Sequence, residues 1–112
     1  MGLYRIPIHP EKIEVIPRLM QSIGFPVVRT ESQDNSLYYF CANPKRLNKY
    51  WTFCITREKK DSPPFFTCGL SQLSKQIVSS LNVEGFFDKD HSAQGTIRVH
   101  RAKHLGRRSA RI

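Results

Sequence analysis

Residues 50–56 read Tyr-Trp-Thr-Phe-Cys-Ile-Thr, and this stretch carries the clearest strand pattern in the chain. Successive side chains of a strand point to opposite faces of a sheet, so every second residue shares a face. Trp51, Phe53 and Ile55 share one face, and their size assigns that face to a hydrophobic core. This stretch therefore predicts a β-strand with one face covered by helices.

Shorter strand patterns lie on both sides of this segment. Residues 27–31 and 37–42 flank a polar stretch with an Asp-Asn pair, which predicts a hairpin with a tight turn at 33–36. Residues 3–8 form a first short strand. Residues 64–68 follow a Pro-Pro break and predict a further, edge-like strand.

Two helices complete the expected fold. Apolar residues recur at spacings of three and four between Pro10 and Gly24, and Pro17 predicts either a kink or a helix that begins near it. The stretch 70–82 predicts a second amphipathic helix with mainly serines outward. The predicted fold class is α+β: a small antiparallel sheet of about four to five strands, with two helices packed on one face.

The composition indicates one small domain. The chain has 112 residues, of which 39% are hydrophobic, which excludes wholesale disorder and leaves no room for two cores. We expect a single α+β domain at 1–87, a loop or linker at 88–97 and a flexible basic tail at 98–112. No apolar run is long enough to span a membrane.

Cysteine usage and the N-terminal residues indicate where the protein works. The chain has three cysteines, and an odd number argues against a closed disulfide framework. Arg5, His9 and Glu11 interrupt the apolar stretch that a signal peptide would need. We therefore expect an intracellular, reducing compartment, the cytoplasm or the nucleus, and no secretion.

The formal charge of +9 is unevenly distributed. Residues 98–112 contain six basic residues and no acidic one, and residues 43–60 contain six basic residues and one acidic one. The rest of the chain holds six basic and eight acidic side chains. This patterning favours a polyanionic partner.

The first basic element is the loop expected between the strands 37–42 and 50–56. Residues 43–49 read Asn-Pro-Lys-Arg-Leu-Asn-Lys and adjoin Tyr50 and Trp51. Cations beside planar rings are the composition that phosphate and base binding requires. Lys45, Arg46 and Lys49 are candidate nucleic-acid-binding residues, and simple solubility is the alternative.

Adjacent aromatic residues leave the second face of the sheet open to two interpretations. In an extended strand, Tyr38 and Phe40 point to the face opposite to Tyr39, and Phe65 points to the face opposite to Phe66. Aromatic side chains on a face without helices can stack bases, as in several RNA-binding folds. The alternative is a second buried surface.

The basic tail is the stronger signal for a polyanionic partner, because so many cations cannot be buried and repel one another in the free chain. It could also be a nuclear-import signal, or an anchor to an acidic protein or an anionic lipid surface. Six further nucleic-acid-binding candidates lie here: Arg98, Arg101, Lys103, Arg107, Arg108 and Arg111.

Catalytic and metal-binding patterns are weak. His100 and His104 are four residues apart, but the three cysteines lie in separate strands and form no Cys-x2-Cys motif. The carboxylates are scattered and the six glycines are isolated, which argues against a nuclease site and a phosphate-binding loop. We expect no metal, no cofactor and no enzyme activity.

These observations favour a non-enzymatic accessory module that binds nucleic acid, in a ribonucleoprotein particle or as a small regulatory protein. RNA is favoured over DNA because neither expected helix carries the basic and amide side chains that read a major groove. The alternative is a protein–protein adaptor or inhibitor whose exposed aromatic sheet face docks a partner in a larger complex. Sequence preference, oligomeric state and strand order stay open.

Overall fold

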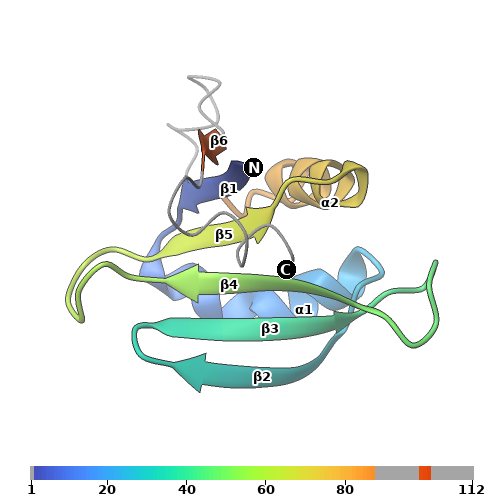
Figure 1. Ribbon diagram of the computed structural model, residues 1–112, viewed down its shortest axis with the longest axis horizontal. Coiled ribbons are helices and arrows are strands. Elements are labelled where there is room, and N and C mark those ends of the chain that lie inside the picture. Colours follow the sequence, from blue (N-terminus) through green and yellow to red (C-terminus); the bar gives the residue numbers. More distant parts are fainter. Residues whose placement is uncertain (1, 88–98, 102–112) are drawn as a thin grey trace.

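A six-stranded antiparallel sheet forms the centre of the computed structural model, which describes residues 2–87 and 99–101 (Figure 1). The strands lie side by side in the order β2-β3-β4-β5-β1-β6. All five pairings between neighbouring strands are antiparallel. The strands are β1 (Gly2–Pro7), β2 (Val27–Gln33), β3 (Ser36–Ala42), β4 (Tyr50–Thr56), β5 (Phe65–Gly69) and β6 (Val99–Arg101).

The segment between β1 and β2 begins as a 3-10 helix (Pro10–Val15) and continues as α1 (Ile16–Ser22). Pro17 lies in the first turn of α1, where a proline costs no intrahelical hydrogen bond. The helix therefore begins near this proline and is not kinked by it, which is the second of the two expected outcomes. Gly24 follows α1 with a φ of 93°, a conformation that glycine adopts without strain.

The second helix, α2 (Gln72–Val83), starts with a serine cap. The Ser71 Oγ accepts a hydrogen bond from the Ser74 N–H at 3.0 Å, which satisfies one of the free donors at the helix start. Ser74 itself is buried, with 2% of its surface exposed, so the expectation of mainly outward serines is wrong at this position.

One hydrophobic core lies between the sheet and both helices. The inward faces of β3, β4 and β5 contribute Tyr39, Phe53 and Phe66, among others. From the helices, Met20 of α1 and Ile77 of α2 pack into the same cluster. Because strand side chains alternate, both helices cover one face of the sheet, and the predicted fold class is confirmed.

Residues 50–56 are strand β4, with the predicted bounds and inward face: Trp51, Phe53 and Ile55 are at most 7% exposed. The predicted edge position of 64–68 is wrong, since β5 lies between β4 and β1. It loses no ladder bond to proline, because Pro64 precedes the strand.

Three residues assigned to the basic tail belong to the sheet. Val99–Arg101 pairs with β1, so Tyr4 lies opposite Val99. This strand makes the sheet six-stranded, where four to five strands were expected. The expected loop or linker at 88–97 and the remaining tail residues, 98 and 102–112, lie outside the described residues.

Candidate nucleic-acid interface

The cationic loop, residues 43–49, joins β3 to β4 as predicted. Its backbone is folded on itself: the Asn43 side-chain oxygen accepts from the Lys45 N–H at 3.0 Å, and the Asn43 carbonyl accepts from the Arg46 N–H at 3.1 Å. Asn48 closes the turn with a φ of 71°, a conformation that asparagine tolerates. The loop is thus an ordered turn that presents its side chains outward.

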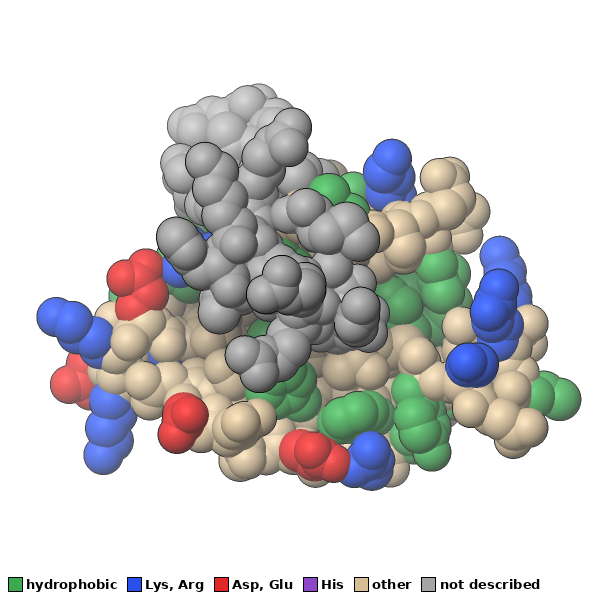
Figure 2. Space-filling model, viewed as in Figure 1, with side chains coloured by type: hydrophobic (Ala, Val, Ile, Leu, Met, Phe, Trp, Pro, Cys, Tyr) green, Lys and Arg blue, Asp and Glu red, His purple; other side chains and the backbone are tan. Residues whose placement is uncertain are grey.

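All three predicted cations of this loop are exposed. Among the described residues, no carboxylate pairs with Lys45, Arg46 or Lys49, whereas Arg5 pairs with Glu58. The loop therefore carries three positive charges without a compensating acid on the described surface. Figure 2 shows basic side chains gathered at this loop, at the right of the view.

The loop ends against the sheet face that the helices leave uncovered, which we call the open face. Tyr50, the first residue of β4, is 56% exposed and lies opposite Ala42 at the base of the loop. Its ring meets the Phe40 ring edge to face, with centroids 6.1 Å apart. The guanidinium carbon of Arg29, from β2, lies 3.9 Å from the centre of the Phe40 ring and 6.0 Å from that of Tyr50.

Three strands thus place one basic and two aromatic side chains beside the cationic loop. Figure 2 shows the hydrophobic side chains of this region on the face turned to the viewer, over β2 to β4. We call Lys45, Arg46, Lys49, Arg29, Phe40 and Tyr50 together the loop–sheet surface.

Neighbouring aromatic residues of a strand lie on opposite faces of the sheet, as the alternation of strand side chains requires. Tyr39 and Phe66 are buried in the core, at 3% and 0% exposure, whereas Tyr38, Phe40 and Phe65 lie on the open face and are half-buried. Trp51 follows the cationic loop in the chain but points into the core, on the inward face predicted for it. Its indole N–H donates to the Ser74 Oγ at 3.1 Å.

Arg29 was missed as a site residue, and Phe40 was considered only as one of the aromatic side chains that could stack bases on the second face of the sheet. Arg29 is 11 positions from Phe40 in the chain, and only the β2–β3 pairing brings the two residues opposite each other. The sequence signal for Phe40 was its position next to Cys41, which points into the core. Because strand side chains alternate, Phe40 must point to the opposite face of the sheet.

The open face carries both signs of charge farther from the loop. Arg5 of β1 lies over the Phe65 ring, with its guanidinium carbon 3.7 Å from the ring centre, and pairs with Glu58 at 3.0 Å. Arg29 likewise pairs with Glu31. Each arginine therefore covers an aromatic face and meets a carboxylate, which leaves Tyr50 as the most exposed ring of this surface.

The second basic turn, between β4 and β5, is built differently from the cationic loop. Arg57 donates from its guanidinium to the Ser62 carbonyl at 2.6 Å, and the Ser62 N–H donates to the Lys59 carbonyl at 3.0 Å. These bonds fold the turn on itself at the surface, away from the aromatic rings of the loop–sheet surface. Lys59 and Lys60 are exposed there and serve as reference cations for experiments.

Of the predicted binding residues in the basic tail, the structure describes only the backbone of Arg101. Arg101 lies in β6, next to β1, and its side chain is not described. Arg98, Lys103, Arg107, Arg108 and Arg111 lie outside the described residues, as does His104. Their assignment to binding therefore stays a prediction from the sequence.

The cysteines are packed as apolar side chains. Cys41, Cys54 and Cys68 are free and buried. Burial raises the pKa of Cys41 and Cys68 to about 12 and that of Cys54 to about 11. These thiols are protonated at neutral pH, the opposite of what a nucleophilic cysteine requires. Within the described part of the chain, no three His, Cys, Asp or Glu side chains are grouped to hold a metal ion.

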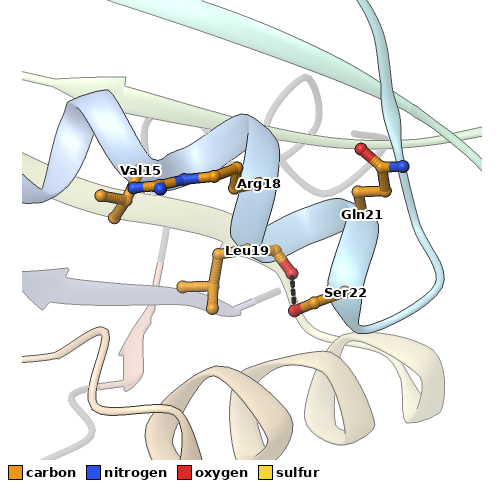
Figure 3. Close-up of a pocket in the computed structure, with 5 residues that line it drawn as sticks. All are labelled: Val15, Arg18, Leu19, Gln21 and Ser22. Atoms are coloured by element: carbon orange, nitrogen blue, oxygen red, sulfur yellow. Dashed lines mark hydrogen bonds between the residues drawn. The ribbon is translucent and has the colours of Figure 1, made fainter.

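A shallow cavity of about 700 Å³ lies along α1, on the helix side of the sheet (Figure 3). Its described lining is Val15, Arg18, Leu19, Gln21 and Ser22. Arg18 is the one ionisable side chain among these lining residues, so they contain no pair of groups for general acid–base catalysis. The cavity is separate from the loop–sheet surface.

Comparison with known proteins gives no family for this chain, because no protein-family model, curated protein or solved structure matches it. Within residues 2–87 and 99–101, no helix has the length and apolar character that crossing a membrane requires. The loop–sheet surface is therefore interpreted from its own chemistry.

Proposed function

We propose that this protein is a non-enzymatic module that binds single-stranded nucleic acid, with RNA favoured, at the loop–sheet surface. The observation that carries the proposal is the position of three uncompensated cations beside the exposed Tyr50 ring. Cations attract phosphates without a strict requirement on direction. A base of the same strand also needs an aromatic ring to stack on, about one nucleotide away from those cations. The loop–sheet surface combines both groups.

RNA or another single strand is favoured over duplex DNA by the place of the helices. Both helices pack on the sheet, and α1 has only seven residues. The exposed positions of α2 offer Lys75 as their one basic side chain. A duplex reader needs a protruding helix with several such groups, whereas an open sheet with an exposed ring suits unpaired bases.

The charge test compares two triple variants of equal net charge. The variant Lys45→Ala/Arg46→Ala/Lys49→Ala removes the three positive charges of the cationic loop. The control variant Lys59→Ala/Lys60→Ala/Lys75→Ala removes three positive charges elsewhere on the surface. Fluorescence anisotropy with a short unstructured RNA at two salt concentrations gives the affinity and its salt slope. We expect the loop variant to bind at least about 10-fold more weakly at low salt and with a flatter slope, and the control variant to stay near wild type. Equal losses in both variants would reduce the cationic loop to a solubility feature.

The stacking test uses Tyr50. We expect Tyr50→Ala to weaken binding by about 1–3 kcal/mol, because base–aromatic stacking contributes that much per base, and Tyr50→Phe to retain it. Tyr50 is largely exposed, so neither change should alter thermal unfolding appreciably. Wild-type affinity in Tyr50→Ala would exclude stacking on this ring.

A second candidate function, a protein–protein adaptor, is favoured by the mixed charges of the open face. The Arg5–Glu58 and Arg29–Glu31 pairs place both signs beside aromatic rings, a composition suited to a protein partner. A pull-down with and without nuclease separates the two functions. A partner retained after nuclease treatment supports the adaptor, and a partner lost supports nucleic-acid binding.

A further inference from the structure

Strand β2 forms an open edge of the sheet (Figure 1). Its inner side pairs with β3, and no described strand pairs with its outer side. Every residue from Val28 to Gln33 is exposed, and Val28 is 51% exposed although it is apolar. Such an edge presents a row of free N–H and C=O groups that can pair with another strand.

The hairpin determines which backbone groups point outward. A two-residue turn, Asp34 and Asn35, joins the strands, so the flanking residues Gln33 and Ser36 form the first hydrogen-bonded pair. Hydrogen-bonded and non-hydrogen-bonded pairs alternate from there. The groups of Arg29 and Glu31 therefore face β3, and those of Thr30 and Ser32 face outward. An extra residue between Val27 and Arg29 interrupts the ladder below this stretch.

We propose that two copies of this chain pair through β2, antiparallel, with Thr30 of one copy opposite Thr30 of the other. In this register the outward groups of the two Thr30 residues bond to each other, and those of Ser32 meet Val28 of the second copy. The free edge groups on both sides of the symmetry axis are then used. Two threonines directly opposite each other are a favourable cross-strand pair.

Charge selects this register and a second copy as the partner. Arg29 and Glu31 lie on the same face of β2, on either side of Thr30. Pairing centred on Thr30 places each Arg29 opposite Glu31 of the other copy, so that four charges alternate around the axis. Of the neighbouring registers that use outward groups, one centred on Ser32 would place Glu31 opposite Gln33, and one centred on Val28 would place Arg29 opposite Val27. Neither charge would then meet its complement. The edge is thus complementary to itself in one register.

The two open faces would lie on the same side of the joined sheet, because a two-fold axis between antiparallel edge strands runs perpendicular to the sheet. Two loop–sheet surfaces would then flank the axis. This pairing does not depend on the proposed function, and it is measured on protein freed of nucleic acid.

The first experiment reverses the charges. Sedimentation and native mass spectrometry over a range of protein concentrations give the dimer dissociation constant of wild type and two variants. Glu31→Arg makes the edge wholly basic, and Arg29→Glu makes it wholly acidic. We expect dimerisation of each to weaken at least about 10-fold, and an equimolar mixture to form heterodimers. A monomeric wild type, undisturbed single variants, or a mixture without heterodimers would each overturn the proposal.

The second experiment reads the register. In a hydrogen-bonded pair the Cα atoms are about 5.5 Å apart, within the range of about 4.4–6.8 Å that a disulfide spans. Thr30→Cys should therefore form a covalent dimer under mild oxidation. In Ser32→Cys the two new cysteines would be four residues apart along the strands, roughly 13 Å, and should not join. Equal cross-linking of both variants, or of neither, would refute this register. Wild type supplies the background, because its three cysteines are buried.

Discussion

The contact between Trp51 and Ser74 gives a sharp test of the packing between β4 and α2. The indole N–H of Trp51 donates to the Ser74 Oγ at 3.1 Å, and both residues are buried, at 7% and 2% exposure. Ser74→Ala removes the acceptor and leaves the indole N–H buried without a partner. An unsatisfied buried donor costs about 1–3 kcal/mol, so we expect the free energy of unfolding to fall by about 2 kcal/mol. The serine cap of α2 stays in place, because its donor is the Ser74 backbone N–H.

A double-mutant cycle separates this hydrogen bond from other effects of the serine. Trp51→Phe removes the N–H donor, so in that background Ser74→Ala should cost only about 1 kcal/mol, because the bond from the Ser71 hydroxyl to the Ser74 Oγ at 2.9 Å is then the one lost. Ser79→Ala is the matched control on α2, because Ser79 is exposed and its replacement should change stability by about 0.5 kcal/mol or less. Urea unfolding followed by circular dichroism measures all four proteins and the control. An equal cost of Ser74→Ala in both backgrounds would refute the role of this hydrogen bond.

Three further predictions concern the core, the tail and the thiols. Phe53→Ala should lower the free energy of unfolding by about 3–5 kcal/mol in urea unfolding, because Phe53 is 1% exposed and its ring lies stacked 4.7 Å from that of Tyr39; a loss near 1 kcal/mol would place it outside the core. Deleting residues 102–112 keeps β6 and should leave thermal unfolding unchanged but flatten the salt dependence of RNA binding, and an unchanged slope would make those cations irrelevant to binding. The free energy of unfolding should fall as pH rises above about 9, because the thiols ionise there in the unfolded chain. In the folded protein, burial keeps the pKa of Cys54 at about 11 and that of Cys41 at about 12. Urea unfolding at several pH values should show a less steep fall in Cys54→Ala, and an identical fall would assign the pH dependence to other groups.

Local pattern was sufficient for the helices, for the strands other than β6, and for the inward face of β4. The alternation in residues 50–56 determined both the bounds of this strand and the burial of Phe53, because strand side chains alternate whatever the neighbours are. The start of α1 next to Pro17 and the turn at Asp34 likewise follow from the backbone preferences of single residues. The cationic loop was predictable for the same reason, since it joins two recognisable strands.

Strand order and the composition of the loop–sheet surface were decided by the tertiary structure. The central place of β5 depends on β1, which comes more than 50 residues earlier in the chain and pairs with it. Arg29 reaches the Phe40 ring because β2 pairs with β3, and Ser74 is buried where α2 packs against Trp51 of β4. Periodicity reports which face of an element is apolar, but not which element will cover it or lie beside it. Those neighbours are selected by the free energy of the whole packed core, to which residues distant in the chain contribute together.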